Sequence, residues 1–163
     1  FDEEDALVEN YTVFFGDASE NFQIKISHLH NVPSGTSRIW SRGILKDTAY
    51  GKFDGIIKIA REARKTDAFL EEKTLLLSEG AKSEAIPALE IGTNDVKAAH
   101  SASCTRVDKN QLFYAAARGI PEDEALRMIA DGFLRNLLTK LPDKNLQEES
   151  YKIISEKLSR NHV

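Results

Sequence analysis

Short apolar runs alternate with clusters of turn-forming residues over the first two thirds of the chain. In residues 22–28 apolar and polar side chains alternate strictly, which indicates a β-strand with one buried face. Comparable runs recur at intervals of roughly 8 to 15 residues. These further runs are 9–15, 37–44, 53–59, 75–77, 85–91 and 96–102. Such a series is typical of a sandwich, a barrel or a β-solenoid, and the pattern alone does not choose among them.

The apolar spacing becomes helical after Asp108. Asp108 can cap a first helix together with Gln111, and Gly119 is suited to end that helix. Pro121 fits the start of a second helix, whose apolar stripe continues to about residue 138. A third helix is predicted over residues 143–160. The boundary divides the chain into an expected β domain, 1–107, and a helical domain, 108–163.

Residues 60–73 fit neither the strand pattern nor the helix pattern. Residues 60–65 have helical propensity but span only about one turn, and they stand between strand-like runs. We therefore expect residues 60–73 to be extended or turn-like.

Composition narrows the class of protein. Of 163 residues 41% are hydrophobic and 29% are charged, which favours a folded domain over a disordered chain. The net charge of −4 makes nucleic acid an unexpected partner. The chain has no apolar run of about 20 residues that could span a membrane and opens on no signal peptide. These features predict a cytoplasmic protein. A start at Phe1, without an initiator Met, favours a fragment or processed product.

Histidines and the single cysteine are the candidate metal ligands. His28 and His30 share a face of their predicted strand, but no third ligand is near, so we expect exposed histidines at a strand edge. His100 and Cys104 also share a face, roughly 13 Å apart if the strand stays extended. A single metal ion could not bind both residues. Residue type alone favours a structural or solvated His100 over a metal ligand. A lone cysteine excludes an internal disulfide and a four-cysteine site.

The segment from residue 96 to residue 119 carries a more specific motif. It contains His100 followed by small residues, then Gln-Leu-Phe-Tyr at 111–114 and Arg-Gly-Ile at 118–120. This segment resembles the SufB/SufD family, the scaffold subunits of the Suf iron–sulfur cluster assembly machine. Residues 53–59, 75–78, 87–91 and 94–97 also look like strand motifs of that family. The resemblance covers about residues 36–140, and residues 1–35 carry no signature of it.

The resemblance implies a fold and a function. The implied fold is a right-handed parallel β-helix followed by about three α-helices. The implied function is a non-catalytic scaffold that binds no cofactor tightly, and that holds at most a transient iron–sulfur cluster or an iron ion. His100 is then a candidate cluster or metal residue. Cys104 is the second candidate as the only thiol of the chain, although the family does not place its functional cysteine there.

The resemblance also implies two partners. A second scaffold chain, either a SufB-like protein or another copy, would pair along the last strand. The expected dimer contact is Val96, Lys97, Ala98 and Ala99. An ABC-type ATPase of the SufC kind would dock on the helices. We expect its contacts at Gln111, Tyr114, Arg118, Glu122 and Glu124, while Leu112 and Phe113 anchor the first helix to the β-helix end.

Departures from the SufB pattern favour a SufD-like chain or a reduced, archaeal-type relative. Aligned without gaps, Glu72 and Ala81 stand where SufB-type proteins have cysteines, and Ser101 stands where they have a glutamate after the motif histidine. This chain therefore lacks those thiolates.

Two other functions were compared with the scaffold. A carbohydrate-active β-solenoid enzyme would need a ladder of acidic and aromatic residues, and the chain has one Trp and no such ladder. A generic β-solenoid interaction module, whose helices bind some other partner, stays open.

Overall fold

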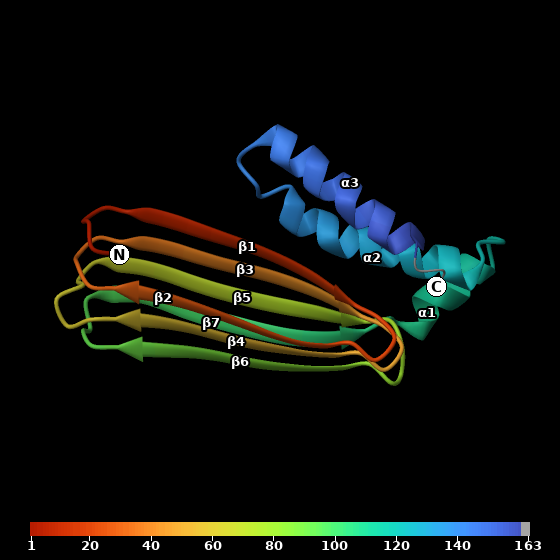
Figure 1. Ribbon diagram of the computed structural model, residues 1–163, viewed down its shortest axis with the longest axis horizontal. Helices are drawn as coiled ribbons and strands as arrows, with labels where there is room; N and C mark the ends of the chain where they lie inside the picture. Colours follow the sequence, from red (N-terminus) through yellow and green to blue (C-terminus); the bar gives the residue numbers. More distant parts are fainter. Residues whose placement is uncertain (161–163) are drawn as a thin grey trace.

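The chain folds into a β-solenoid followed by helices (Figure 1). The computed structural model describes the backbone of residues 1–160 and the side chains of residues 1–156. Within that part the strands are β1 (Leu7–Gly16), β2 (Asn21–His30), β3 (Thr36–Leu45), β4 (Tyr50–Ile59), β5 (Thr66–Leu76), β6 (Lys82–Ile91) and β7 (Val96–Arg106). The helices are α1 (Lys109–Ala116), α2 (Glu122–Leu138) and α3 (Lys144–Arg160).

Successive strands alternate between two parallel sheets. One sheet has the order β1-β3-β5-β7 and the other β2-β4-β6, so each strand pairs with the strand two positions along the chain. Leu7 pairs with Thr36, and Thr36 with Asp67, which gives a turn of about 30 residues. This arrangement confirms the parallel β-helix and excludes the sandwich and barrel that the strand pattern had left open.

Side-chain alternation fills the space between the sheets, which we call the lumen. Ile39 in β3 and Leu70 in β5 are register partners, and both pack against Phe53 and Ile57 of the opposite sheet. These four side chains are at most 1% exposed. The period of two in the sequence therefore reflects alternation between the lumen and the outer surface.

The corners of the solenoid stack from one turn to the next. Ala18 and Asp47 occupy corresponding corners with φ of 49° and 55°, and Ser34 and Lys65 do so at the other end with φ of 63° and 59°. Backbone hydrogen bonds join corners, for example from Thr48 N to Ala18 O at 2.9 Å. The left-handed corners allow the chain to reverse direction within a few residues.

Helix α2 covers part of the outer face of the first sheet (Figure 1). Ala130 and Leu134 of α2 are buried against Ile44 and Leu75 of the sheet. Arg42 of β3 is 2% exposed beneath this helix, where it donates to Glu71 Oε1. The helices are thus attached to the solenoid by an apolar seam with one partly buried ion pair.

Most local predictions are confirmed, with some differences. Residues 61–65 are turn-like and Thr66 begins β5, as expected for the stretch that fitted neither pattern. Asp108 caps α1, but its side chain accepts from Asn110 N at 2.9 Å, and Gln111 N bonds the Asp108 carbonyl instead. Gly119, at φ +78°, follows the end of α1 as predicted. None of the helices within residues 1–160 is long and apolar enough to cross a membrane.

Two burial predictions were wrong. His28 and His30 are 8% and 0% exposed, because they face the lumen, whereas a strand edge was expected. Phe113 is 77% exposed, so it does not anchor α1 to the solenoid. Every residue of α1 is described, and none of them is buried.

Candidate functional site

The terminal strand β7 carries both predicted cluster residues. Within the described strands β7 pairs with β5 alone, so it forms an edge of its sheet. His100 pairs with the buried Leu70, and Cys104 pairs with the buried Thr74. Because paired residues of neighbouring strands share a face, His100 and Cys104 both lie on the lumen face, and both are exposed at its open end. The strand remains extended between them, so the structure does not bring them together.

The predicted dimer contact lies at the start of this edge strand. Val96 and Ala98 are on the lumen face and half-buried, whereas Lys97 and Ala99 alternate to the outer face and are exposed. The contact residues therefore divide between two faces, and the feature they share is the backbone edge of β7.

A row of polar residues, not predicted from the sequence, continues inside the lumen. Ser41 of β3 pairs with Glu72 of β5, and both side chains are fully buried. Thr74, also buried, donates its hydroxyl to Glu72 Oε1. Glu72 Oε2 and Ser41 Oγ have no hydrogen-bond partner among the described residues. Glu72 follows Ala68 and Leu70 at a spacing of two residues, and this alternation could have indicated from the sequence that Glu72 lies on the buried face of its strand.

The buried carboxyl group of Glu72 lies close enough to the Cys104 thiol to affect its pKa. Burial raises the pKa of Glu72, against opposing contributions from the Thr74 hydrogen bond and the charge of Arg42. Burial also raises the pKa of the Cys104 thiol, as does the nearby Glu72 carboxylate, while Arg106 acts in the opposite direction. Burial thus shifts both groups toward their neutral forms.

The two lumen histidines form a separate cluster near the start of the solenoid. His30 Nε2 lies 2.9 Å from Ser37 Oγ, and the ring stacks on Phe1 at 4.1 Å between centroids. Burial lowers the pKa of His28, and burial together with the charge of His28 lowers the pKa of His30 to about 4. Both imidazoles are therefore neutral near pH 7. Among the described residues, no three His, Cys, Asp or Glu side chains gather as a metal site.

Helices α1 and α2 bring several of the predicted docking residues together. Gln111, Tyr114 and Arg118 line one side of a pocket of about 450 Å³, and Met128 of α2 lies on the other side. The Arg118 guanidinium carbon stands 3.5 Å from the centre of the Tyr114 ring. Tyr114 is 59% exposed and Met128 57%, so this surface presents large apolar groups to solvent.

The predicted acidic residues lie beside that pocket rather than in it. Glu122 and Glu124 belong to the first turn of α2, where their charge complements the positive end of the helix. Both are exposed, and neither lines the pocket. Their position gives the α1–α2 surface an acidic border.

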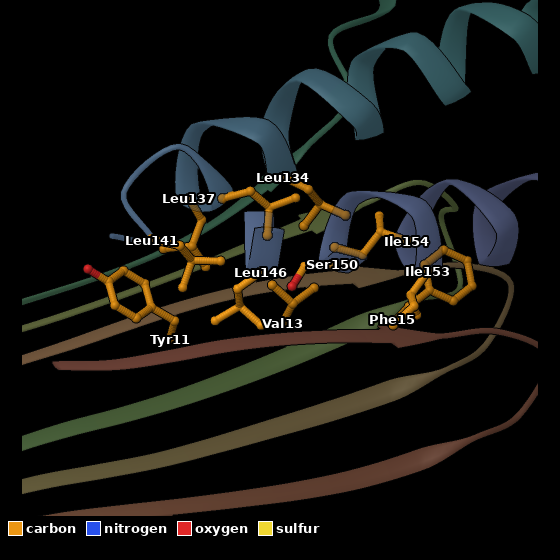
Figure 2. A pocket seen from close by; sticks show the side chains of 11 residues that line it. Tyr11, Val13, Phe15, Leu134, Leu137, Leu141, Leu146, Ser150, Ile153 and Ile154 are labelled. Atoms are coloured by element: carbon orange, nitrogen blue, oxygen red, sulfur yellow. The ribbon is translucent and has the colours of Figure 1, made fainter. Parts of the chain in front are cut away.

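A second pocket separates β1 from helices α2 and α3 (Figure 2). It has a volume of about 500 Å³, and its walls are apolar except for Tyr11 and Ser150. In Figure 2 Leu134 and Leu137 of α2 lie on one side of the pocket, and Val13 and Leu146 lie on the other. The Tyr11 hydroxyl donates to the Lys140 carbonyl at 3.0 Å, outside the apolar space. This pocket offers packing surface rather than groups for acid–base chemistry.

Comparisons with known proteins agree with this organisation. A family model described as the SufBD core domain of SUF system FeS cluster assembly matches residues 1–133. The match begins at residue 1, so the expectation that residues 1–35 carry no family signature was wrong.

Individual relatives show the same similarity. The iron–sulfur cluster assembly protein SufD of Bacillus subtilis is 39% identical over 143 residues, which cover 88% of this chain and 32% of the relative. The SufD protein of Escherichia coli is 34% identical over 129 residues, covering 79% and 30%. An iron–sulfur cluster assembly SufBD family protein of Mycobacterium tuberculosis is 31% identical over 144 residues, covering 83% and 36%. The chain thus spans about a third of the length of these relatives.

Proposed function

We propose that this chain, which belongs to the SufBD core domain family of the SUF iron–sulfur cluster assembly system, is a non-catalytic scaffold for cluster assembly in the cytoplasm. The observation that carries the proposal is the family match over residues 1–133, which include all seven described strands and helix α1. A sequence identity of 39% to a SufD protein over most of the chain supports the SufD side of the family.

The scaffold pairs with a second chain along β7 in this proposal. Support comes from the edge position of β7, which leaves backbone groups unpaired in the described structure. The partner is a SufB-like protein or a second copy, and it supplies the cysteines that are absent at Glu72 and Ala81. A transient cluster or iron ion would then rest near His100 at the junction, with Cys104 further along the same face.

Light scattering tests this pairing directly. The chain alone and its mixture with a SufB-like protein are measured at tens of micromolar. We expect a dimer in at least one preparation. Monomers in both would contradict pairing along β7.

Replacement of His100 tests its role at the junction. His100→Ala changes an exposed side chain, so the fold should persist while anaerobic cluster assembly with the SufB-like partner becomes slower. Ser103→Ala, on the outer face of the same strand, is the matched control. Unchanged assembly in His100→Ala would make that residue structural.

The α1–α2 surface docks an ABC-type ATPase of the SufC kind in this proposal. Tyr114 and Arg118 are residue types that dominate binding interfaces, and here they stack on each other beside a pocket. Exposed apolar groups at Phe113 and Met128 enlarge the contact, and Glu122 and Glu124 add charge at its border. The geometry suits a groove that accepts a helix or loop of the partner.

A pair of double variants tests the docking surface. Tyr114→Ala with Arg118→Ala should weaken ATPase binding at least about tenfold, since each hot-spot truncation removes over 1 kcal/mol. Tyr151→Ala with Arg135→Ala is the matched control, because it removes another Arg–Tyr stack, at 4.2 Å, from α2 and α3. Binding is measured by calorimetry, and unfolding is followed in parallel. Equal affinities in the two variants would refute this surface and favour an interaction module with a different partner.

A further inference from the structure

The pocket between α1 and α2 has an apolar interior. On the α2 side it is lined by Ala125, Met128 and Ile129, which share one face of the helix because they are three and four residues apart. Ala115 lines the pocket from α1, and Ile120 lines it from the connection between the two helices. All five residues are apolar, so a side chain that fills the pocket of about 450 Å³ is apolar as well.

The walls of this pocket present apolar surface to solvent. Tyr114 of α1 is 59% exposed and Met128 of α2 is 57% exposed. All residues of α1 are described and none is buried, so the α1 wall is not part of the protein core. An exposed apolar surface bordered by polar residues is typical of a binding site for another protein.

Two carboxylates extend the face of α2 that lines the pocket. Glu122 precedes the lining residue Ala125 by three positions, and Glu124 precedes Met128 by four. Both glutamates are exposed, and neither forms an ion pair within the part of the chain that the structure describes. Their charges are therefore available to a partner.

Negative charge predominates where α1 meets α2. The first turn of α2 holds Glu122, Asp123 and Glu124. Arg118 is the charged residue among those that line the pocket, and its guanidinium stacks on the Tyr114 ring. Three carboxylates thus lie near one guanidinium, and the surface that complements them carries positive charge.

We infer that the partner of this surface inserts one large apolar side chain into the α1–α2 pocket and places a lysine or arginine beside Glu122 and Glu124. This inference rests on the ATPase docking proposed above and adds the chemistry of the contact. The apolar side chain supplies most of the affinity, because it leaves water for a pocket bordered by Tyr114 and Met128. The basic residue stays at the exposed border, where charge accelerates association more than it slows dissociation.

Filling the pocket tests the apolar contact. Ala115→Leu enlarges a lining residue, and Ala116→Leu is the matched control at an exposed position of α1 outside the pocket. We expect Ala115→Leu to weaken ATPase binding at least about tenfold through faster dissociation, whereas Ala116→Leu stays within about twofold. Surface plasmon resonance with immobilised ATPase measures both rates, and thermal unfolding shows that each variant is folded.

Neutralising the carboxylates tests the basic contact. Glu122→Gln with Glu124→Gln should slow association about three- to tenfold at low ionic strength and make it less sensitive to salt. The dissociation rate should change little. Glu148→Gln with Glu149→Gln is the control, because it removes the same charge from exposed positions of α3.

The results distinguish this contact from docking in general. If the parental chain does not bind the ATPase, both the docking and the contact are refuted. If it binds, and the alanine double variant described above loses binding, but the pocket-filling variant binds like its control, then docking stands and the pocket receives no side chain. Association that is equally slow in the two glutamine variants, or faster in the α2 variant, would show that the partner's facing surface is not basic.

Discussion

Phe53 and Phe113 are the same residue type in two opposite settings. Phe53 is 1% exposed in the solenoid, enclosed by Ile39, Ile57 and Leu70, whereas Phe113 is 77% exposed on α1. The solenoid is stabilised by its filled lumen, and α1 contributes no buried residue to the fold. The comparison separates residues that maintain the structure from large apolar residues that are free to contact a partner.

The largest expected effect on stability comes from removing a buried side chain from the lumen. Phe53→Ala should reduce the free energy of unfolding by about 3–5 kcal/mol, because it removes a buried ring and leaves a cavity. Phe113→Ala, the matched change in α1, should stay within about 0.5 kcal/mol. Denaturant titration of both variants measures the difference. Similar losses would mean that α1 is part of the core.

Low pH should destabilise the solenoid through its buried histidines. The pKa of His30 falls from 6.5 to about 4 in the folded chain, so the unfolded chain takes up the proton first as pH drops. The free energy of unfolding should therefore be unaffected by His30 above pH 6.5 and should fall by about 3 kcal/mol as pH drops through about 4. The lowered pKa of His28 adds a contribution of the same sign, while the raised pKa of Glu72 acts in the opposite direction.

A variant isolates the histidine contribution. His30→Gln should show a smaller loss of stability between pH 6.5 and pH 4, since glutamine does not titrate, and the effect of Glu72 cancels in the difference. Unfolding is measured by denaturant titration at each pH. Parallel pH profiles for the two proteins would contradict the buried neutral imidazole.

Replacement of Arg42 should destabilise the contact between the first sheet and α2. Arg42→Met keeps the apolar stem but removes the charge beside Glu71, which should cost about 1–3 kcal/mol at this partly buried pair. Lys58→Met breaks the exposed pair with Glu90 and should change stability by less than about 0.5 kcal/mol. Thermal unfolding distinguishes them. An equal effect would place Arg42 outside the seam.

The smallest expected effect is a gain in stability from a substitution at a solenoid corner. Ala18 holds φ at 49°, which costs an L-residue energy that glycine does not pay. Ala18→Gly should raise the free energy of unfolding by about 0.5 kcal/mol after the entropy of the unfolded chain is counted. Ala117→Gly, at φ −63°, should instead lower it. A loss in Ala18→Gly would show that the corner is unstrained.

Much of the local structure was predictable from side-chain order. The period-two run at residues 22–28 lies within β2, and the predicted start at Asp108 is the cap of α1. His100 and Cys104 were correctly placed on one face of an extended strand. Phe22, Ile24 and Ile26 mark the inner face of β2, and His28 and His30 continue the same alternation, so the pattern did contain a signal for their burial. They were nevertheless expected at an exposed strand edge, whereas the structure places them in the lumen.

The sequence by itself determined most of the strands, the start of the helical region and the family, because each depends on residues close together along the chain. The tertiary structure alone decided that turns of about 30 residues stack in parallel, which sets Ile39 beside Leu70 and Ser41 beside Glu72. It also decided that Phe113 is exposed and Glu72 buried, against their ordinary preferences. Burial depends on what the remaining chain places around a side chain, and those neighbours are distant in sequence.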